Sequence, residues 1–398
     1  MKKFALVLSG GGFKGAFQIG ALRQLKNQWN LIDPNSATMK FDVVAGVSVG
    51  SLNGVLTASG EFNALEKLWL DIGNNVENIY TSDFIDTKNQ TDELKVHFDF
   101  QKIRQRFIPN VDLRISLWKG LRVLFSKSQR EKLISELLQK VEDDFSANFK
   151  GFRAIADNTP LKKRLDALIN INKVHGIFKC GFVSLNDGKY YACAQSAFKT
   201  DEDFRRGILA STSMPIVWEP VETIRFIHDE LGTVSQSVDG GIRNVSPLAD
   251  VIDEINKDDP AHEYTIFIIN CNSGEVAYED FRNANIAGIA MRSLNDIAIT
   301  EIFNNDITEF LRINDIIGQV RSVNPTLEIR NYNVREGRTS KILRPFKAII
   351  IQPDAGILGD TLVANQTLNS RRIKHGEDKA MMALSVYKER KGPDLVIV

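Results

Sequence analysis

Two short apolar runs, each followed by a glycine-rich turn and a helix-like segment, lie within the first 60 residues. The first run, residues 4–8, ends at a serine and three glycines, and the second, residues 42–45, ends at Gly-Val-Ser-Val-Gly, residues 46–50. Short, continuously apolar runs that stop at glycine are typical of buried parallel strands. Two successive strand–turn–helix units therefore predict an α/β domain built on a parallel sheet.

The sequence after these units changes character and then becomes sheet-like again. Residues 61–172 have a helical pattern rich in basic and aromatic residues, which predicts a mainly helical insertion or cap. Residues 178–194 predict a hairpin around Asn-Asp-Gly, and further buried strands are expected at residues 264–269 and 348–351. Residues 286–320 indicate one or two long amphipathic helices. We expect a catalytic domain over residues 1–260 that contains the insertion, with residues 261–398 continuing the same α/β domain.

Composition excludes some classes of function. The chain has 50 Lys and Arg against 50 Asp and Glu, so its net charge gives no general attraction to nucleic acid, and no nucleic-acid partner is expected. Three cysteines without metal-ligand spacing fit buried thiols in a reducing compartment, and neither a signal peptide nor a membrane-spanning run is apparent. We therefore expect a cytoplasmic protein without a cysteine-based metal site.

The first glycine turn, Gly10-Gly11-Gly12-Phe13-Lys14-Gly15, follows a strand and opens a helix. Backbone N–H groups at such a helix start can bind an anion, either an oxyanion or a phosphate. The same residues match the dinucleotide-binding pattern, which also needs an acidic residue at the end of the next strand. Asp33 lies at roughly the right distance, but it stands in a loop-like Asp-Pro-Asn segment. The loop alone leaves both interpretations open.

The second turn, Gly46-Val47-Ser48-Val49-Gly50, matches the nucleophile elbow of serine hydrolases. A serine on a sharp strand-to-helix turn projects its hydroxyl from the sheet, and small flanking residues prevent clashes there. The dipole of the following helix favours negative charge near that oxygen. With a strand expected before it and a helix after it, Ser48 is predicted to be the nucleophile.

A serine nucleophile needs a base, and the sequence leaves two sources open. A Ser-Asp-His order is possible with Asp239 and either His262 or His375, although none of the five histidines has a local sequence that clearly presents an imidazole. The alternative is Asp239 alone, which precedes Gly240 and Gly241 and could sit in a tight turn with backbone donors nearby. An Asp-Gly pair is also common in ordinary turns.

Taken together, the motifs resemble those of the patatin-like phospholipases. The glycine loop, the elbow and Asp239-Gly-Gly occur in the family's order, and residues 210–215 (ASTSMP) match its A-S-x-x-x-P segment. Residues 157–161 (DNTPL) look like the D-x-x-P-L segment of bacterial members. The resemblance covers roughly residues 4–250 and is weaker beyond. Ser9 differs from the plant members, which usually carry Asp there.

The resemblance implies a three-layer α/β/α sandwich and a lipid acyl hydrolase of the phospholipase A or lysophospholipase kind, with a phospholipid or other lipid ester as substrate. It implies a Ser48–Asp239 dyad without histidine, metal or cofactor. The oxyanion hole would be formed by the backbone N–H groups of Gly11 and Gly12. Lys14 stands where the family carries Arg or Lys and could favour negative charge at the oxyanion or lipid phosphate; a solvated lysine at a helix start is the alternative.

Residues 101–133 carry nine Lys and Arg against two acidic residues, with Trp118 and other apolar residues between them. Such a basic amphipathic segment can lie on an anionic bilayer, which would make the protein a peripheral membrane protein. A cap helix that packs its apolar stripe on the core is the other interpretation. Besides the hydrolase, the sequence leaves open a dinucleotide-binding oxidoreductase, a Ser-His-Asp esterase and a catalytically silent scaffold.

Overall fold

The computed structural model describes residues 1–85, 99–107, 150–228, 232–282, 292–332 and 340–398, with a few single residues between these ranges. The strands are β1 (Lys2–Leu8), β2 (Val43–Val47), β3 (Ile177–Ser184), β4 (Tyr190–Ala194), β5 (Val221–Arg225), β6 (Thr233–Asp239), β7 (Glu263–Ile269), β8 (Ile329–Tyr332), β9 (Ser340–Leu343), β10 (Lys347–Ile351) and β11 (Leu395–Ile397). The α-helices are α1 (Ala16–Asn27), α2 (Trp29–Ile32), α3 (Val49–Ala58), α4 (Phe62–Asn74), α5 (Phe100–Phe107), α8 (Thr159–Leu168), α9 (Asp201–Thr212), α10 (Leu248–Ile255), α12 (Ile299–Val323) and α13 (Gln366–Glu389). Short helical turns are η1 (Gly12–Gly15), η2 (Val76–Asn78), η3 (Ile171–Lys173), η4 (Gln195–Ala197), η5 (Gly240–Ile242) and the π-helical η6 (Arg292–Ala298).

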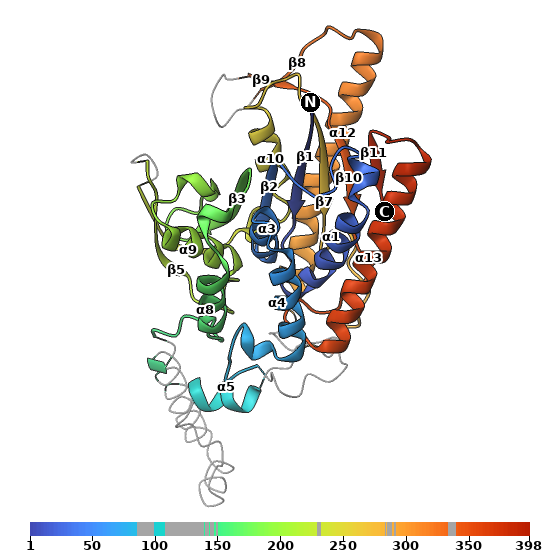
Figure 1. The fold of residues 1–398 in the computed structure, drawn as a ribbon. Coiled ribbons are helices and arrows are strands. Elements are labelled where there is room, and N and C mark those ends of the chain that lie inside the picture. Colours follow the sequence, from blue (N-terminus) through green and yellow to red (C-terminus); the bar gives the residue numbers. More distant parts are fainter. Residues whose placement is uncertain are drawn as a thin grey trace, which may run out of the picture.

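A mixed sheet forms the centre of the molecule (Figure 1). Its strands follow the order β11-β10-β7-β1-β2-β3-β6-β5, with β4 also paired to β3. The strands from β11 to β3 run parallel to one another, whereas β4 and β6 run antiparallel to β3. Because β1 and β2 are parallel neighbours, the glycine loop and the elbow that follow them emerge at the same edge of the sheet.

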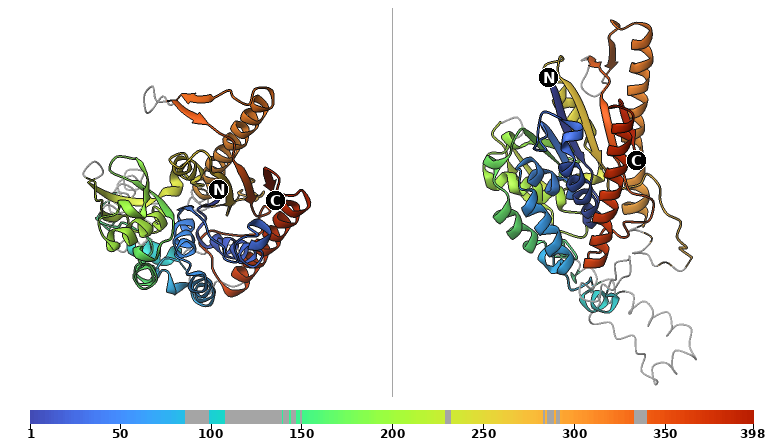
Figure 2. Two further views of the ribbon diagram at one scale, coloured as in Figure 1. Left: turned by 45° about the horizontal axis from the view of Figure 1, so that its top comes forward. Right: turned by 45° about the vertical axis from the view of Figure 1, so that its right-hand side comes forward.

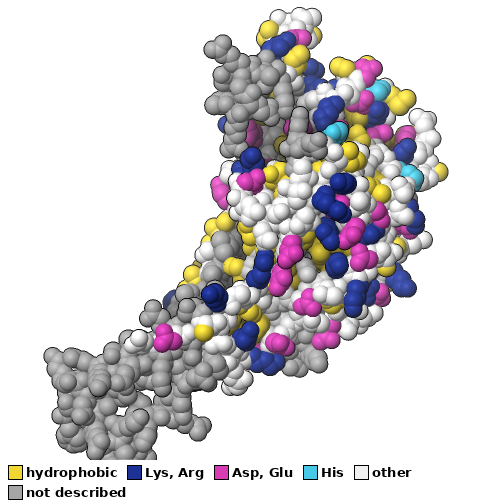
Figure 3. All heavy atoms as spheres, turned by 90° about the vertical axis from the view of Figure 1, so that its left-hand side faces the viewer, with side chains coloured by type: hydrophobic (Ala, Val, Ile, Leu, Met, Phe, Trp, Pro, Cys, Tyr) yellow, Lys and Arg dark blue, Asp and Glu magenta, His cyan; other side chains and the backbone are white. Residues whose placement is uncertain are grey.

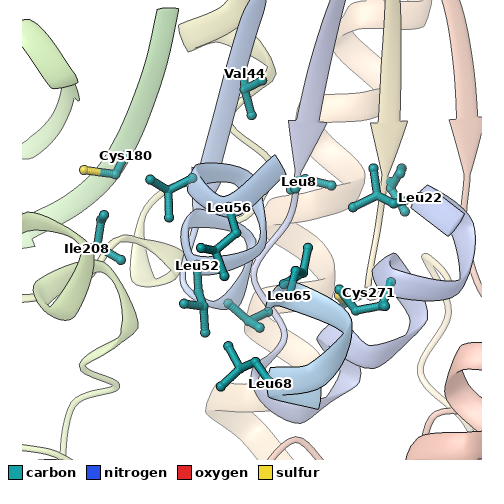
Figure 4. Close-up of a cluster of buried hydrophobic side chains, with 14 of the residues drawn as sticks. Leu8, Leu22, Val44, Leu52, Leu56, Leu65, Leu68, Cys180, Ile208 and Cys271 are labelled. Atoms are coloured by element: carbon teal, nitrogen blue, oxygen red, sulfur yellow. The ribbon is translucent and has the colours of Figure 1, made fainter. Parts of the chain in front are cut away.

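Helices cover both faces of this sheet. On one face, Leu6, Leu8 and Val44 point into a core shared with α1, α3, α4, α9 and α13. Figure 4 shows this core, where leucines from β1, α1, α3 and α4 converge near Cys271. On the other face, alternate residues of the same strands, such as Ala5 and Val7, pack against α10 and α12. The predicted three-layer α/β/α sandwich is confirmed.

The expected strands at residues 4–8, 178–183, 264–269 and 348–351 lie within β1, β3, β7 and β10. The one expected at residues 42–45 corresponds to β2, which begins one residue later, and β3 and β4 form the expected hairpin. Strands β5, β6, β8, β9 and β11 were not predicted. They are short or carry polar residues, so the apolar pattern that signals a buried strand is weak in them.

The first helix of the segment predicted as an insertion belongs to the main core. In α4, Leu65, Leu68 and Trp69 are buried, and the helix packs against α1, α3 and α13. Most of residues 86–149, including most of the basic segment 101–133, lies outside the described residues. The described residues beyond α4 include the helices α5 and α8, but the cap over residues 61–172 stays a prediction.

The C-terminal part of α12 and the β8–β9 hairpin extend past the sheet at the end where β1 begins (Figures 1 and 2). A groove of about 1620 Å³ lies at this end, lined by residues of α10, α12 and β9 and by the start of β7. Among the described residues, no helix is both long enough and apolar enough to cross a bilayer.

Candidate active site

Ser48 stands at the turn between β2 and α3, with φ 57° and ψ −132°. This backbone conformation is rare for a residue with a side chain and is the strained geometry expected of a nucleophile elbow. The turn is tight enough that a Cβ on Gly46 would lie 2.1 Å from the carbonyl oxygen of Gly50. Glycine is therefore required at position 46, and a tight strand-to-helix turn stands where the sequence predicted the elbow.

Asp239 ends β6 and lies beside Ser48. Its carboxylate accepts a hydrogen bond of 2.7 Å from the backbone N–H of Gly241, and the nearby Ser48 side chain also favours the charged form of the carboxylate. Burial, with only 5% of the residue exposed, raises the pKa of Asp239 to about 7, although both of these groups oppose this shift. A carboxylate with that pKa is suited to exchange protons near neutral pH.

The segment 210–215 positions both members of this pair. The backbone N–H of Ser48 donates to Ser211 Oγ at 3.0 Å, and Ser211 Oγ donates to the carbonyl of Gly181 at 2.6 Å. The backbone N–H of Asp239 donates to the carbonyl of Ser213 at 2.9 Å. The elbow, β3 and β6 are thus tied together through the end of α9.

The glycine loop passes beside the elbow, and a Cβ on Gly10 would lie 3.1 Å from that of Ser48. The N–H of Gly10 donates to the carbonyl of Val245, and the N–H of Phe13 donates to the carbonyl of Thr361, each at 2.9 Å. In the described structure, the N–H groups of Gly11 and Gly12 have no such acceptor, as expected for the first residues of a helical turn. Their role as the oxyanion hole stays a prediction.

Gly12 has φ 53°, and a Cβ there would lie 2.6 Å from the carbonyl oxygen of Thr361. A side chain at this position would therefore push the loop away from the segment 354–365. Below the loop, Cys271 is buried, and burial raises its pKa to about 12, which keeps the thiol neutral.

Arg372 on α13 is completely buried behind the glycine loop. Its guanidinium donates only to oxygens of uncharged groups: the carbonyls of Phe13, Leu358, Asp360 and Val363 and the amide oxygen of Asn369. Burial lowers the pKa of Arg372 to about 9, and the charge of Asp360 opposes the shift. This side chain holds the glycine loop and the segment 358–363 in register.

Lys14 is partly buried beside the loop. Desolvation lowers the pKa of Lys14, whereas the charges of Asp296 and Asp360 raise it. The charge of Arg372 also lowers it. Its predicted role as a source of positive potential stays a prediction.

A network of buried amides also supports the loop. Gln18 Nε2 donates to the carbonyls of Ser9 and Ile269, and Asn53 Nδ2 donates to Gly15 and to Gln18 Oε1. Trp69 Nε1 donates to Asn53 Oδ1 at 2.8 Å. Sequence reasoning identified the segment 210–215 but assigned no role to Ser211, and it missed Arg372 and this network. These polar residues stand on otherwise apolar helix faces, and that pattern can be seen in the sequence. The pattern does not reveal which groups they bond to.

The residues named for the alternative sites lie elsewhere. His262 contacts Asp258 at 2.9 Å near the amino ends of β1 and β7, away from the carboxyl-end edge that carries Ser48. His375 Nε2 accepts the backbone N–H of Asp354 at 3.1 Å and its ring packs on Phe17. Asp33 lies in the loop before β2, bonded to Asn35, so it is not the acid at the strand end that a dinucleotide site needs.

The site combines the serine hydroxyl of Ser48, the buried carboxylate of Asp239 with a pKa near neutrality, and the two backbone N–H groups of Gly11 and Gly12. These are the groups that acyl transfer to and from a serine requires. Among the described residues, no group of three or more His, Cys, Asp or Glu side chains could hold a metal ion.

Residues 6–252 match the family model described as patatin-like phospholipase. A search of curated proteins found no match. The fold is similar to that of VipD from Legionella pneumophila, with 15% identity and a TM-score of 0.39; the match covers 97% of this chain and 67% of that one. It is also similar to the type III effector ExoU of Pseudomonas aeruginosa, with 12% identity and a TM-score of 0.34; the match covers 97% of this chain and 53% of that one. Because both scores are low, the sequence match over residues 6–252 carries the family assignment.

Proposed function

The chain belongs to the patatin-like phospholipase family of lipid acyl hydrolases, and on that premise we propose that it hydrolyses phospholipid or lysophospholipid esters through a Ser48–Asp239 dyad. The observation that carries the proposal is that the Ser48 side chain lies close enough to the buried carboxylate of Asp239 to lower its pKa, on a turn that Ser211 and Ser213 tie to the end of β6. In the described structure, neither residue is hydrogen-bonded to a histidine.

In the first half-reaction, Ser48 Oγ attacks the ester carbonyl as its proton passes to the carboxylate of Asp239. The new C–O bond leaves negative charge on the former carbonyl oxygen. When the tetrahedral intermediate collapses, the ester C–O bond breaks and Asp239 returns the proton to the departing alcohol. An acyl group then remains on Ser48.

In the second half-reaction, Asp239 takes a proton from water as the water oxygen attacks the acyl carbon. The bond between Ser48 Oγ and that carbon breaks, Asp239 returns the proton to Ser48, and a fatty acid leaves. Another alcohol in place of water would give acyl transfer by the same steps.

The N–H groups of Gly11 and Gly12 would bind the oxyanion in both half-reactions. Loss of one donor of this kind costs about 3 kcal/mol in other hydrolases. Lys14 would favour the same charge or that of a lipid phosphate, and the helix dipole of α3 acts in the same direction. Arg372 and the Gln18–Asn53–Trp69 network hold the donors in place before substrate arrives.

The test is fatty-acid release from mixed phospholipid vesicles, from lysophospholipid and from a short-chain soluble ester, with EDTA present. Ser48→Ala and Asp239→Asn should each abolish release, whereas the His262→Ala/His375→Ala double variant should keep it. Comparison of diacyl and lysophospholipid substrates decides between phospholipase A and lysophospholipase activity.

If the histidine variant is inactive, the base is not Asp239 alone and the dyad is wrong. If wild-type protein is inert on every ester while folded, a silent scaffold or a requirement for an activator replaces this proposal. A cytoplasmic location and membrane contact through residues 101–133 remain predictions. Figure 3 shows charges of both signs mixed over the described part of one face, so that face offers no single-sign surface.

A further inference from the structure

The side chain of Tyr190, the first residue of β4, lies across two backbone segments of the candidate site. A Cβ on Gly181 would lie 2.7 Å from Tyr190 Cζ, and a Cβ on Gly240 would lie 3.1 Å from Tyr190 Cε2. A side chain at either position would crowd the ring, which occupies space that is open because both residues are glycines. The tyrosine ring therefore packs directly on the main chain at both positions.

These two segments hold the proposed nucleophile and base. The carbonyl of Gly181 accepts the Ser211 hydroxyl, which in turn accepts the backbone N–H of Ser48. Gly240 directly follows Asp239, and a Cβ on Gly240 would also lie 2.6 Å from the carbonyl oxygen of Gly181. The tyrosine ring therefore contacts both the segment that supports the nucleophile and the turn that carries the base.

Asp250 on α10 anchors the outer end of this ring. The Tyr190 hydroxyl donates to Asp250 Oδ2 at 2.7 Å, and Asn244 Nδ2 lies 3.5 Å from the same oxygen. Burial raises the pKa of Asp250 to about 6, while the hydrogen bond from Tyr190 and the charge of Lys179 oppose this shift. The carboxylate is therefore ionised at neutral pH, and a hydrogen bond to an ionised acceptor is stronger than one between neutral groups.

We propose that Tyr190, anchored by Asp250, is a positioning residue that fixes the distance between Ser48 and Asp239. The inference rests on the proposed function, because it concerns the geometry of the same dyad. The tyrosine is given no contact with substrate and acts through the two glycine segments. Without its anchor the ring can turn away, and the elbow and the Asp-Gly-Gly turn then shift relative to each other.

The next residue of the same strand offers a matched control. Tyr191 is also bonded to an aspartate, since its hydroxyl donates to Asp187 at 2.6 Å. Successive residues of a strand point to opposite faces of the sheet, and the Tyr191 ring stacks on Phe182 on the face away from α10. Tyr191→Phe therefore removes a tyrosine–aspartate hydrogen bond from β4 without changing the anchor of Tyr190.

The test is the rate at which a fluorophosphonate reacts with Ser48. The serine oxygen bonds to phosphorus, fluoride leaves and the serine proton passes to Asp239, so the rate reports the geometry of the pair. We expect Tyr190→Phe and Asp250→Ala to react about tenfold more slowly, since a misplacement of about 1 Å can cost about 100-fold. Asp250→Asn keeps an acceptor for the tyrosine hydroxyl and should react within about threefold of wild type.

The two losses should not multiply, because both variants remove the same hydrogen bond. The double variant Tyr190→Phe/Asp250→Ala should react no more slowly than the slower single variant, and Tyr191→Phe should react as wild type does. Labelling of every variant should still go to completion, because a displaced dyad lowers the rate, whereas partial unfolding lowers the labelled fraction. On the soluble short-chain ester, kcat should fall in parallel with the labelling rate while KM changes by less than about twofold.

The proposal is overturned if Tyr190→Phe reacts at the wild-type rate, if Tyr191→Phe slows equally, or if only the labelled fraction falls. Equal loss in Asp250→Asn and Asp250→Ala, or losses that multiply in the double variant, would show that the hydrogen bond is not the anchor and would overturn it as well.

Failure of the proposed function is a separate outcome. If wild-type protein takes no label at Ser48 and hydrolyses no ester, the dyad is wrong, and backbone amide hydrogen exchange still decides the role of the tyrosine. The N–H groups of Ser48 and Gly241, which donate to Ser211 and Asp239, should exchange faster in Tyr190→Phe than in Tyr191→Phe. Equal exchange in the two variants would show that the ring does not hold these segments.

Discussion

The hydroxyl of Ser211 accepts a hydrogen bond of 3.0 Å from the backbone N–H of Ser48, although 163 positions separate the two residues in the chain. The same hydroxyl donates to the carbonyl of Gly181. A side chain at the end of α9 therefore fixes the elbow relative to β3 and, through the neighbouring Ser213, relative to Asp239.

Replacement of Ser211 by alanine should slow catalysis through misplacement of the nucleophile. The change leaves the Ser48 N–H and the Gly181 carbonyl unpaired in a buried site, which costs about 1–3 kcal/mol of stability. We expect kcat to fall about tenfold or more with little change in KM, because the substrate contacts remain. Ser184→Ala is the control, since Ser184 Oγ is also buried and donates to a carbonyl, that of Ser235. A similar loss of kcat in the control would show that the effect is only structural.

Hydrolysis should depend on pH through Asp239. The base must be ionised, so kcat/KM on a soluble ester should rise with pH and reach half its plateau at about pH 7, the pKa to which burial raises this carboxyl. A flat profile between about pH 5 and about pH 8 would contradict the assignment of Asp239 as the base.

Stability should change with pH in the opposite direction. Because the pKa of Asp239 is higher in the folded than in the unfolded chain, the folded state binds the extra proton between pH 3.8, the ordinary pKa of aspartate, and about pH 7. The contribution of Asp239 to stability is therefore complete below this window and lost as the pH rises through it. In urea unfolding, Asp239→Asn should gain stability relative to wild type from about pH 5 to about pH 8. A constant difference between the two proteins would mean that the folded-state pKa is not raised.

Substitution of Arg372 should loosen the oxyanion loop. Lysine at this position cannot reach the several acceptors that the guanidinium contacts, so Arg372→Lys leaves carbonyl groups unpaired in the core. We expect a loss of roughly 2–4 kcal/mol in unfolding free energy and a fall in kcat from the displaced loop. The neighbouring Arg371 is exposed, and Arg371→Lys should change neither quantity. Wild-type stability in Arg372→Lys would mean that the loop does not depend on this side chain.

A methyl group on Gly12 should abolish activity. It would meet the carbonyl oxygen of Thr361 at 2.6 Å and would also disfavour the positive φ, so the loop must move and its donors leave the oxyanion position. We expect Gly12→Ala to lower kcat about 100-fold or more. Gly60→Ala is the matched control, because Gly60 has φ 69° with no atom near the added carbon. It should cost about 1 kcal/mol of stability and leave kcat unchanged, and equal effects in the two variants would refute the steric argument.

The amino-acid sequence by itself determined the parts of the protein that depend on neighbouring residues. The apolar run before Ser9, the small residues around Ser48 and the glycines at 10–12 specify a strand, an elbow and an anion-binding turn, since the backbone geometry of each is set within a few positions. Their order, together with Asp239-Gly-Gly and the segment 210–215, was also sufficient to predict the family and the three-layer fold.

The tertiary structure alone decided which groups meet. From the sequence, Asp239, His262 and His375 were all candidates for activating Ser48. Only the sheet topology sets Asp239 beside Ser48 and His262 near the other end of the sheet. The positions of Ser211 and Arg372 likewise depend on contacts between elements far apart in the chain. Local sequence cannot fix such contacts, because the free energy that selects them comes from packing of the whole core and from burial that leaves each polar group only one set of partners.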